Sequence, residues 1–230
     1  MNAIIFLIIY DNVCGKDFII AMDKLHNKRE NKNTWYFSPE PQSESSPKEI
    51  TFTLNSESFA FTTDAGVFSR EHVDPASRAL IKAMPPLNGR VLDFGCGYGP
   101  IGICLAKINP NTKFELIDVN KRAVSLTAHN IIKNGITNAT VYESNGFSHV
   151  TGQFDAIATN PPIHLGKDFL YDLFKTCKNK LINNGSLYTV FLRRQGAKSA
   201  IAFLEECFGN CQVVDKGGGI WVLHSQNTET

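Results

Sequence analysis

A glycine-rich segment carries the clearest chemical signal in the sequence. Residues 93–100 read DFGCGYGP, with three alternating glycines between two apolar runs. Glycine is needed where the backbone turns sharply and where a ligand must approach it closely. The pattern therefore predicts a strand, a tight ligand-binding turn and a helix. The expected cofactor contacts in the turn are Gly95, Cys96, Gly97 and Gly99.

The acid that opens this segment discriminates between two classes of cofactor. A dinucleotide-binding turn reads GxGxxG, but Pro100 stands where the last glycine would be. A pyrophosphate above the turn would be repelled by Asp93, whereas an ammonium group would be attracted to it. S-adenosylmethionine carries an amino group and a sulfonium and has no phosphate. The turn therefore favours S-adenosylmethionine as the cofactor, with Asp93 as one of its contacts. The alternative is a nicotinamide oxidoreductase, which Pro100 and Asp93 both argue against.

Two further segments are expected beside the turn. Asp118 ends the next apolar run, where an acid can accept hydrogen bonds from both ribose hydroxyls of a bound nucleoside. The alternative is that Asp118 only caps the helix that starts near Lys121. If Asp118 binds the ribose, Val119 would face the adenine ring. Asn145 and Gly146 follow the third run, where they could bind the adenine edge or form an ordinary turn.

The sequence Asn160-Pro161-Pro162 offers groups for catalysis at a planar amine. Such an amine on a nucleobase is a poor nucleophile because its lone pair is delocalised into the ring. The Asn160 side-chain oxygen and the Pro161 carbonyl could accept its two N–H groups and orient the lone pair toward a methyl donor, so that positioning does most of the work. All three residues are predicted to be catalytic, with Asn160 also touching the cofactor. The alternative is an Asx-turn that merely ends a strand.

The residues after this sequence are predicted to contact the substrate. Ile163 offers only apolar contact, so stacking on a base would have to come from elsewhere, with Phe147 and Phe191 as candidates. His164 could contact a phosphate or a base. The alternative for His164 is an ordinary loop residue.

One segment is distinctly basic. Residues 164–200 contain seven Lys or Arg and two Asp, in a chain whose net charge is only +1. Arg193 and Arg194 are predicted to bind the substrate, because phosphate contacts dominate nucleic-acid affinity. A solvated surface with no partner is the alternative.

Alternating strands and helices must bring these residues together. Repeated βα units predict an α/β fold with a Rossmann-like, doubly wound, mostly parallel seven-stranded sheet. The tight turn near the C-terminus adds one antiparallel strand. Ligands bind outside the carboxyl ends of such strands, so Asn160 should lie beside the glycine turn. The predicted strands are Arg90–Phe94, Lys113–Asp118, Ala139–Glu143, Phe154–Thr159, Ser186–Leu192, Gln212–Asp215 and Ile220–His224, and the predicted helices are Ile101–Ile108, Lys121–Asn134, Asp168–Lys178 and Ala197–Phe208.

The region before the sheet is predicted to have two parts. Residues 1–49 are expected to form a poorly packed arm, and residues 50–230 one domain that begins with a β-hairpin over residues 50–62. A helix over Val73–Ala83 follows, with Asp74 as its N-cap.

Composition excludes several classes of protein. The chain has 230 residues, 43% of them apolar, which is ordinary for a soluble globular protein. Its six cysteines form no CxxC pair, and we expect reduced thiols, no metal and a cytoplasmic location. The apolar run Ala3–Ile9 is too short to cross a membrane, and translation from Met22 is a hypothesis. No P-loop pattern is present in the sequence.

These motifs resemble the small-domain methyltransferase family, which includes bacterial enzymes that methylate guanine N2 in small-subunit ribosomal RNA. The resemblance covers about Trp35 to the C-terminus. Residues 66–69 (GVFS) are its most discriminating part, because generic methyltransferases lack this segment. The segments that carry it are Thr63–Ser69, the Asp74 region, Asp93–Gly102, Asp118–Asn120 and Asn160–Ile163.

The resemblance implies a role in ribosomal RNA processing, with S-adenosylmethionine as cofactor and RNA as partner. It implies that Phe68 folds over the methionine end of the cofactor, and we expect a monomer or weak dimer. The chain departs from the two-domain ribosomal RNA enzymes because it contains one copy of the domain. Methylation of adenine N6 or of a protein glutamine amide, and a non-catalytic RNA-binding module, remain the alternatives.

Overall fold

The computed structural model describes residues 43–228. The predictions for the apolar run Ala3–Ile9, for a start at Met22 and for most of the arm lie outside the described residues. The first regular element, β1, begins at Lys48, two residues earlier than predicted. No helix within residues 43–228 is long and apolar enough to cross a lipid bilayer.

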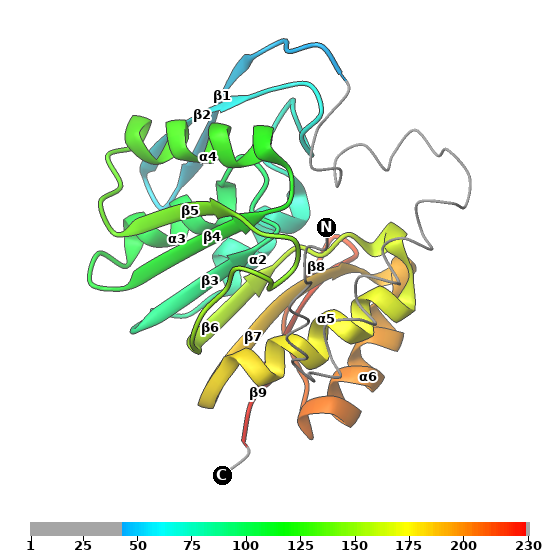
Figure 1. Ribbon diagram of the computed structural model, residues 1–230. Coiled ribbons are helices and arrows are strands. Elements are labelled where there is room, and N and C mark those ends of the chain that lie inside the picture. The colour runs from blue at the N-terminus through cyan, green and yellow to red at the C-terminus, as the bar shows by residue number, and fades with distance from the viewer. Residues whose placement is uncertain (1–42, 229–230) are drawn as a thin grey trace, which may run out of the picture. The chain divides into compact units, whose positions relative to one another are not determined.

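A seven-stranded sheet lies at the centre of the described residues (Figure 1). Its strand order is β5-β4-β3-β6-β7-β9-β8. Strands β3 to β7 pair in parallel, and β9 runs antiparallel to both β7 and β8. The predicted Rossmann-like sheet with one reversed strand is therefore confirmed. The strands are β3 Arg90–Phe94, β4 Lys113–Asp118, β5 Ala139–Glu143, β6 Phe154–Thr159, β7 Leu181–Leu192, β8 Gln212–Gly217 and β9 Ile220–Gln226.

Helices cover both faces of this sheet because its strands are apolar on both sides. Successive side chains of a strand point to opposite faces, so Val91 of β3 belongs to one core and Leu92 to the other. The first core is covered by α2, α3 and α4, and the second by α5 and α6. The helices are α2 Pro75–Ala83, α3 Pro100–Ile108, α4 Lys121–Lys133, α5 Lys167–Lys180 and α6 Lys198–Phe208.

The predicted hairpin is present and packs on α4. Strands β1 (Lys48–Leu54) and β2 (Glu57–Thr63) pair antiparallel. Asn55 and Ser56 both have positive φ, as the preferred two-residue hairpin turn requires. The side-chain oxygen of Asn130 on α4 accepts a hydrogen bond of 2.8 Å from the Thr62 N–H. This contact ties the end of β2 to α4, just before the segment that contains Phe68.

Strand β7 is longer than predicted. Asn183, Asn184 and Gly185 are turn-forming residues, so the sequence predicts a strand only from Ser186. In the structure Leu181 already pairs with Phe154, and the register shifts before Ser186 pairs with Ala156. Asn184 has φ +63. An irregular stretch in the strand thus absorbs the residues that suggested a turn.

Candidate active site

The glycine turn lies between β3 and α3 and is tied to the neighbouring strand. The N–H groups of Gly95 and Cys96 both donate to the Ile117 carbonyl at 2.9 Å. Gly95 and Gly97 have φ +73 and +60, a region that costs an L-residue about 1–2 kcal/mol. A Cβ at either glycine would meet no atom within 4 Å. The positive φ values explain why glycine occupies these two positions. The backbone of the turn is open to a ligand.

Asp118 lies directly against this turn. Its Oδ2 accepts a hydrogen bond of 2.9 Å from Gly97 N–H, and its Oδ1 accepts one of 2.9 Å from Asn120 N–H. Burial raises the pKa of the Asp118 carboxyl to about 6. The N-cap of α4 is Asn120, whose side-chain oxygen accepts from Arg122 N–H at 2.9 Å. Asp118 is therefore not the cap of α4, which removes the structural alternative for this acid.

Asp93 lies beneath the turn, where it is 1% exposed. The pleat of β3 points its side chain toward α3, and its Oδ2 accepts a hydrogen bond of 2.8 Å from Gly102 N–H. Its Oδ1 has no hydrogen-bond partner among the described residues. Burial raises the pKa of Asp93 to about 7, and the charge of Asp118 adds to the effect. Asp93 does not line the cavity described below, so its contact with a cofactor stays a prediction.

Asn160–Pro162, which we call the Asn160 corner, lies beside the glycine turn because β6 pairs with β3. Ala158 is opposite Asp93 in the parallel register, so both strands end at the same edge. The hydroxyl of Thr159 donates to the Phe94 carbonyl at 3.0 Å and ties the two ends together. An Asx-turn at Asn160 would need the N–H of residue 162, and Pro162 has none. An Asx-turn at Asn160 is therefore excluded, and the catalytic role of this asparagine stays a prediction.

One cavity of about 650 Å³ joins the two corners, a volume within the usual range for small-molecule sites. It brings together most of the residues that the sequence singles out. The predicted site residues that line it are Phe68, Gly95, Cys96, Gly97, Asp118, Asn160, Pro161, Pro162, Ile163 and His164.

Several predicted site residues do not line this cavity. Gly99 is the N-cap of α3, and a Cβ there would lie 2.7 Å from Ile103 Cδ1, so it serves packing. Asn145 and Gly146 lie in the loop after β5, where Ser144 N–H donates to the Asp118 carbonyl at 3.0 Å. The predicted residues outside the lining are Asp93, Gly99, Val119, Asn145, Gly146, Arg193 and Arg194, and their contacts stay predictions.

The aromatic side chains proposed to stack on a base do not reach the cavity. Phe147 stacks on Phe94 with ring centroids 4.8 Å apart. Phe191 is 1% exposed and packs edge-on against Phe174 in the second core. Phe68 is the aromatic residue that both lines the cavity and is strongly exposed, at 48%. The signal for Phe68 was the GVFS segment alone.

The segment around Phe68 is fixed from several sides. Gly66 and Ser69 have φ +82 and +55, and the Asn120 side-chain amide donates to the Gly66 carbonyl at 3.0 Å. The Ser69 hydroxyl donates to the His72 carbonyl at 2.6 Å. Without the family resemblance this segment reads as a loop after a hairpin. The structure makes it one wall of the cavity.

Other lining residues were missed by sequence reasoning about the site. Asp74 and Ser77 come from the start of α2, which precedes the sheet in the chain, and Tyr98 lies inside the glycine turn. The sequence predicted Asp74 as a helix cap in a segment that carries the family resemblance, without a role in the site. It is a cap, since Ser77 N–H donates to its Oδ2 at 3.0 Å. No sequence signal links α2 to the Asn160 corner.

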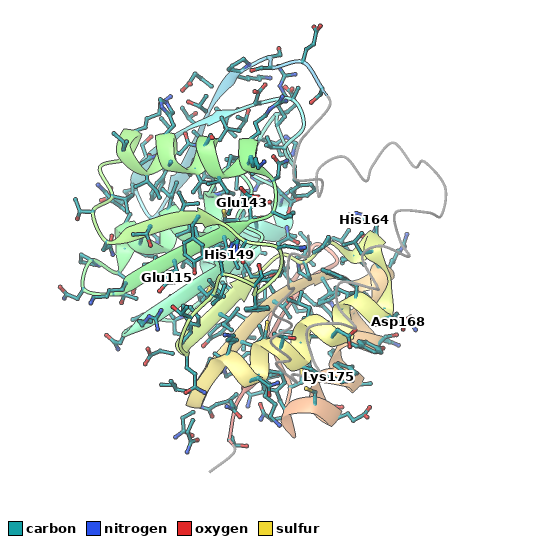
Figure 2. All side chains as sticks on the ribbon, viewed as in Figure 1. Glu115, Glu143, His149, His164, Asp168 and Lys175 are labelled. Atoms are coloured by element: carbon teal, nitrogen blue, oxygen red, sulfur yellow. The ribbon has the colours of Figure 1, made fainter. Side chains whose placement is uncertain are left out.

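The charged residues that line the cavity are acidic. Asp74 and Asp118 are carboxylates in its lining, and the described lining residues include no Lys or Arg. Burial lowers the pKa of His164, which favours the neutral imidazole at this rim. Figure 2 shows His164 near the start of α5. Such a lining fits a cationic ligand better than a pyrophosphate. The sequence favoured the same class of cofactor from the charge of Asp93, which lies beneath the turn and outside the lining.

The methyltransferase small domain family matches residues 58–224. The chain belongs to this family. With the glycine turn and the cavity described above, the predicted class, an S-adenosylmethionine-dependent methyltransferase, is confirmed.

Two individual relatives are similar to this chain over most of its length. The uncharacterized protein YbxB of Bacillus subtilis is 42% identical over 195 residues, which cover 83% of this chain and 97% of that protein. Ribosomal RNA small subunit methyltransferase C of Vibrio parahaemolyticus is 33% identical over 79% of this chain and 53% of its own length. The chain thus spans about half the length of that relative.

A solved structure is similar over the same region. It is the T. thermophilus 16S rRNA N2 G1207 methyltransferase (RsmC) in complex with AdoMet and guanosine. The TM-score is 0.71 at 25% sequence identity, over 81% of this chain and 52% of that one. The chain is therefore a methyltransferase similar to the RsmC type.

Proposed function

We propose that this enzyme methylates an exocyclic amine of a nucleobase in small-subunit ribosomal RNA, with guanine N2 as the target. The observation that carries the proposal is the position of Asn160 in the same cavity as the glycine turn. The names of the methyltransferase C relatives and of the RsmC complex support RNA as the substrate. The acidic lining supports a cationic cofactor.

S-adenosylmethionine, when bound, supplies an electrophilic methyl group on a sulfonium. On the protein side, the open backbone of Gly95 and Gly97 allows close approach of the cofactor's amino-acid part. Asp118 would accept hydrogen bonds from the ribose hydroxyls. Together these residues would hold the cofactor in one orientation in the cavity.

The Asn160 corner holds the nucleophile. The Asn160 side-chain oxygen and the Pro161 carbonyl would accept the two N–H groups of the amine and point its lone pair at the methyl group. The N–C bond would form as the C–S bond of the cofactor breaks, which releases S-adenosylhomocysteine, and the methylated nitrogen would then lose one proton to solvent. With the reacting atoms about 3–3.5 Å apart, positioning would supply most of the acceleration. Ile163, Phe68 and Leu192 line the cavity with apolar surface that excludes water from the target base. A base in a duplex would first have to leave the stack.

Adenine N6 and a protein glutamine amide present the same planar NH₂ group, so the corner chemistry alone does not separate them. The RsmC structure, that of an N2 G1207 methyltransferase in complex with guanosine, favours guanine. A non-catalytic RNA-binding module is disfavoured because the turn, Asp118 and Asn160 are all in place around one cavity.

The test is methyl transfer from labelled S-adenosylmethionine to ribosomal subunits of a strain that lacks the gene. The digested RNA is then analysed by nucleoside mass spectrometry. We expect labelled N2-methylguanosine with the wild-type protein. Asn160→Ala should fold, bind the cofactor and lose turnover by about 10²-fold or more.

A control variant is available on the exposed surface of α5. Lys175 lies on α5 (Figure 2) and is not among the residues that line the cavity. Lys175→Ala should therefore leave turnover unchanged. Label in N6-methyladenosine or in ribosomal protein would replace the guanine proposal by the corresponding alternative. Equal turnover of Asn160→Ala would remove this residue from the chemistry.

A further inference from the structure

Two residues of α2 hold the side chain of Asn160. Its amide nitrogen, Nδ2, donates to Asp74 Oδ2 and to Ser77 Oγ, each at 3.1 Å. Ser77 is 3% exposed, and Asp74 lies at the first turn of α2. An Asn amide has two N–H donors, so these two contacts use both of them.

The acceptor oxygen of Asp74 decides which end of the amide faces the cavity. An ionised carboxylate only accepts hydrogen bonds, so it pairs with the Asn160 nitrogen and repels the oxygen. A rotation of the amide by 180° would place the Asn160 oxygen against the Asp74 carboxylate. The observed contacts therefore leave Asn160 Oδ1 as the polar atom available to a substrate.

Asp74 is itself rigidly placed. Its Oδ2 also accepts the Ser77 N–H at 3.0 Å, and its carbonyl accepts the Arg78 N–H at 2.9 Å. It thus caps α2 and orients Asn160 with the same carboxylate oxygen. The capping role can be separated from the orienting role, because a shorter capping side chain would keep the first contact and lose the second.

We propose that Asp74 and Ser77 are positioning residues that lock the Asn160 amide with its oxygen toward the substrate. The lock restricts the site to substrates that donate an N–H, and it excludes those that present only an acceptor at this point. This inference rests on the proposed function, since it concerns the same asparagine and the atom that it presents to the substrate. The residues that set this orientation lie on α2, far in sequence from Asn160-Pro161-Pro162.

The experiment compares two substitutions at one position. Asp74→Ser keeps a good N-cap for α2 but is too short to reach Asn160, whereas Asp74→Asn keeps an oxygen in place for both contacts. We expect kcat of Asp74→Ser to fall about 10- to 100-fold, with the affinity for S-adenosylmethionine and the Tm unchanged. Asp74→Asn should recover most of kcat. Ser77→Ala removes one of the two acceptors, so its kcat should lie between those of Asp74→Ser and Asp74→Asn.

A double-mutant cycle tests whether the effect passes through Asn160. Asp74→Ser should cost little further turnover in an Asn160→Ala background, because the group that it orients is gone. Lys82→Ala, on the last turn of the same helix, is the matched control. Full turnover of Asp74→Ser, or independent losses in the cycle, would overturn the proposal. A weakened affinity for the cofactor would also overturn it and would assign Asp74 to cofactor binding.

A spectroscopic readout needs no substrate. The side-chain NH₂ signals of Asn160, assigned by their absence in Asn160→Ala, should be shifted and protected in the free protein, and Asp74→Ser should abolish this. If the wild-type protein methylates no RNA but these signals behave as expected, the proposed function fails while the lock stands. Unprotected NH₂ signals in the wild-type protein would reject the lock itself.

Discussion

Gly97 donates its backbone N–H to Asp118 Oδ2 at 2.9 Å. This contact joins the turn after β3 to the end of β4, at the floor of the cavity. The same carboxylate accepts the Asn120 N–H through its other oxygen, so its orientation is fixed before any ligand binds. Asp118 can therefore offer its remaining acceptor capacity to a ribose in a fixed direction.

Replacing Asp118 tests this arrangement. Asp118→Asn keeps the shape but loses the charge, and hydrogen bonds to a charged group are worth about 1.5–3 kcal/mol. We expect the affinity for S-adenosylmethionine to fall roughly 10- to 100-fold, with kcat at saturating cofactor much less affected. Isothermal titration calorimetry measures the affinity. Unaltered binding would remove Asp118 from the cofactor site.

The raised pKa of Asp118 makes cofactor affinity depend on pH. Burial places this pKa at about 6 in the free protein, so the neutral carboxyl prevails at lower pH. The ribose hydroxyls bind best to the ionised form, so binding lowers the pKa and releases a proton in this range. The affinity should rise as the pH increases through about 6 and then level off. Calorimetry in two buffers of different ionisation enthalpy detects the released proton.

Asp93 must be separated from this effect, because its pKa of about 7 is raised partly by Asp118. Asp118→Asn should remove the rise in affinity near pH 6. If the rise persists in that variant, Asp93 is its source. A flat profile in the wild-type protein would contradict the assignment of either acid.

Two glycines of the turn, Gly97 and Gly99, should respond differently to substitution. A Cβ at Gly97 meets open space in the cavity, whereas a Cβ at Gly99 would lie 2.7 Å from Ile103 and 3.0 Å from Thr127. Gly97→Ala should therefore lower stability by only the strain of its positive φ, about 1–2 kcal/mol, and still weaken cofactor binding. Gly99→Ala should lower stability more, because packing is added to the same strain. Thermal unfolding and calorimetry on both variants provide the comparison.

The sheet was predictable because its signals are local. Four strands, β3 to β6, have the predicted bounds, since each is a short apolar run between turn residues or helix caps. The juxtaposition of Asn160 with the glycine turn also followed, since parallel neighbours end at one edge. Strand β7 was shortened in the prediction because Asn184 adopts a positive φ within a strand.

The remainder of the site depends on contacts that no local pattern encodes. Asp74 reads as a helix cap, and its bond to Asn160 spans 86 residues of sequence. The packing of Phe147 on Phe94 could not be inferred from either residue alone. Residues on loops, such as Asn145, were placed at the correct edge of the sheet, but their side-chain directions are set by tertiary packing.

The basic segment after β7 gives the last prediction. Arg193 and Arg194 are exposed and lie between two residues that line the cavity, Leu192 and Gln195. The Arg193 N–H donates to the Gly219 carbonyl at 2.7 Å, which fixes the segment against the turn between β8 and β9. The backbone that carries both arginines is thus fixed next to the cavity lining. We expect their guanidinium groups to reach the phosphates of a bound RNA.

If these groups bind phosphates, their removal should weaken RNA binding at all sequences alike. Arg193→Ala and Arg194→Ala should each reduce the slope of log affinity against log salt by about 1, while leaving cofactor affinity unchanged. Fluorescence anisotropy with a ribosomal RNA fragment over a salt series measures the slope. Lys175→Ala, a cation of α5 away from the cavity lining, should leave the slope intact. An equal loss in all three variants would assign the effect to net charge rather than to contacts at this rim.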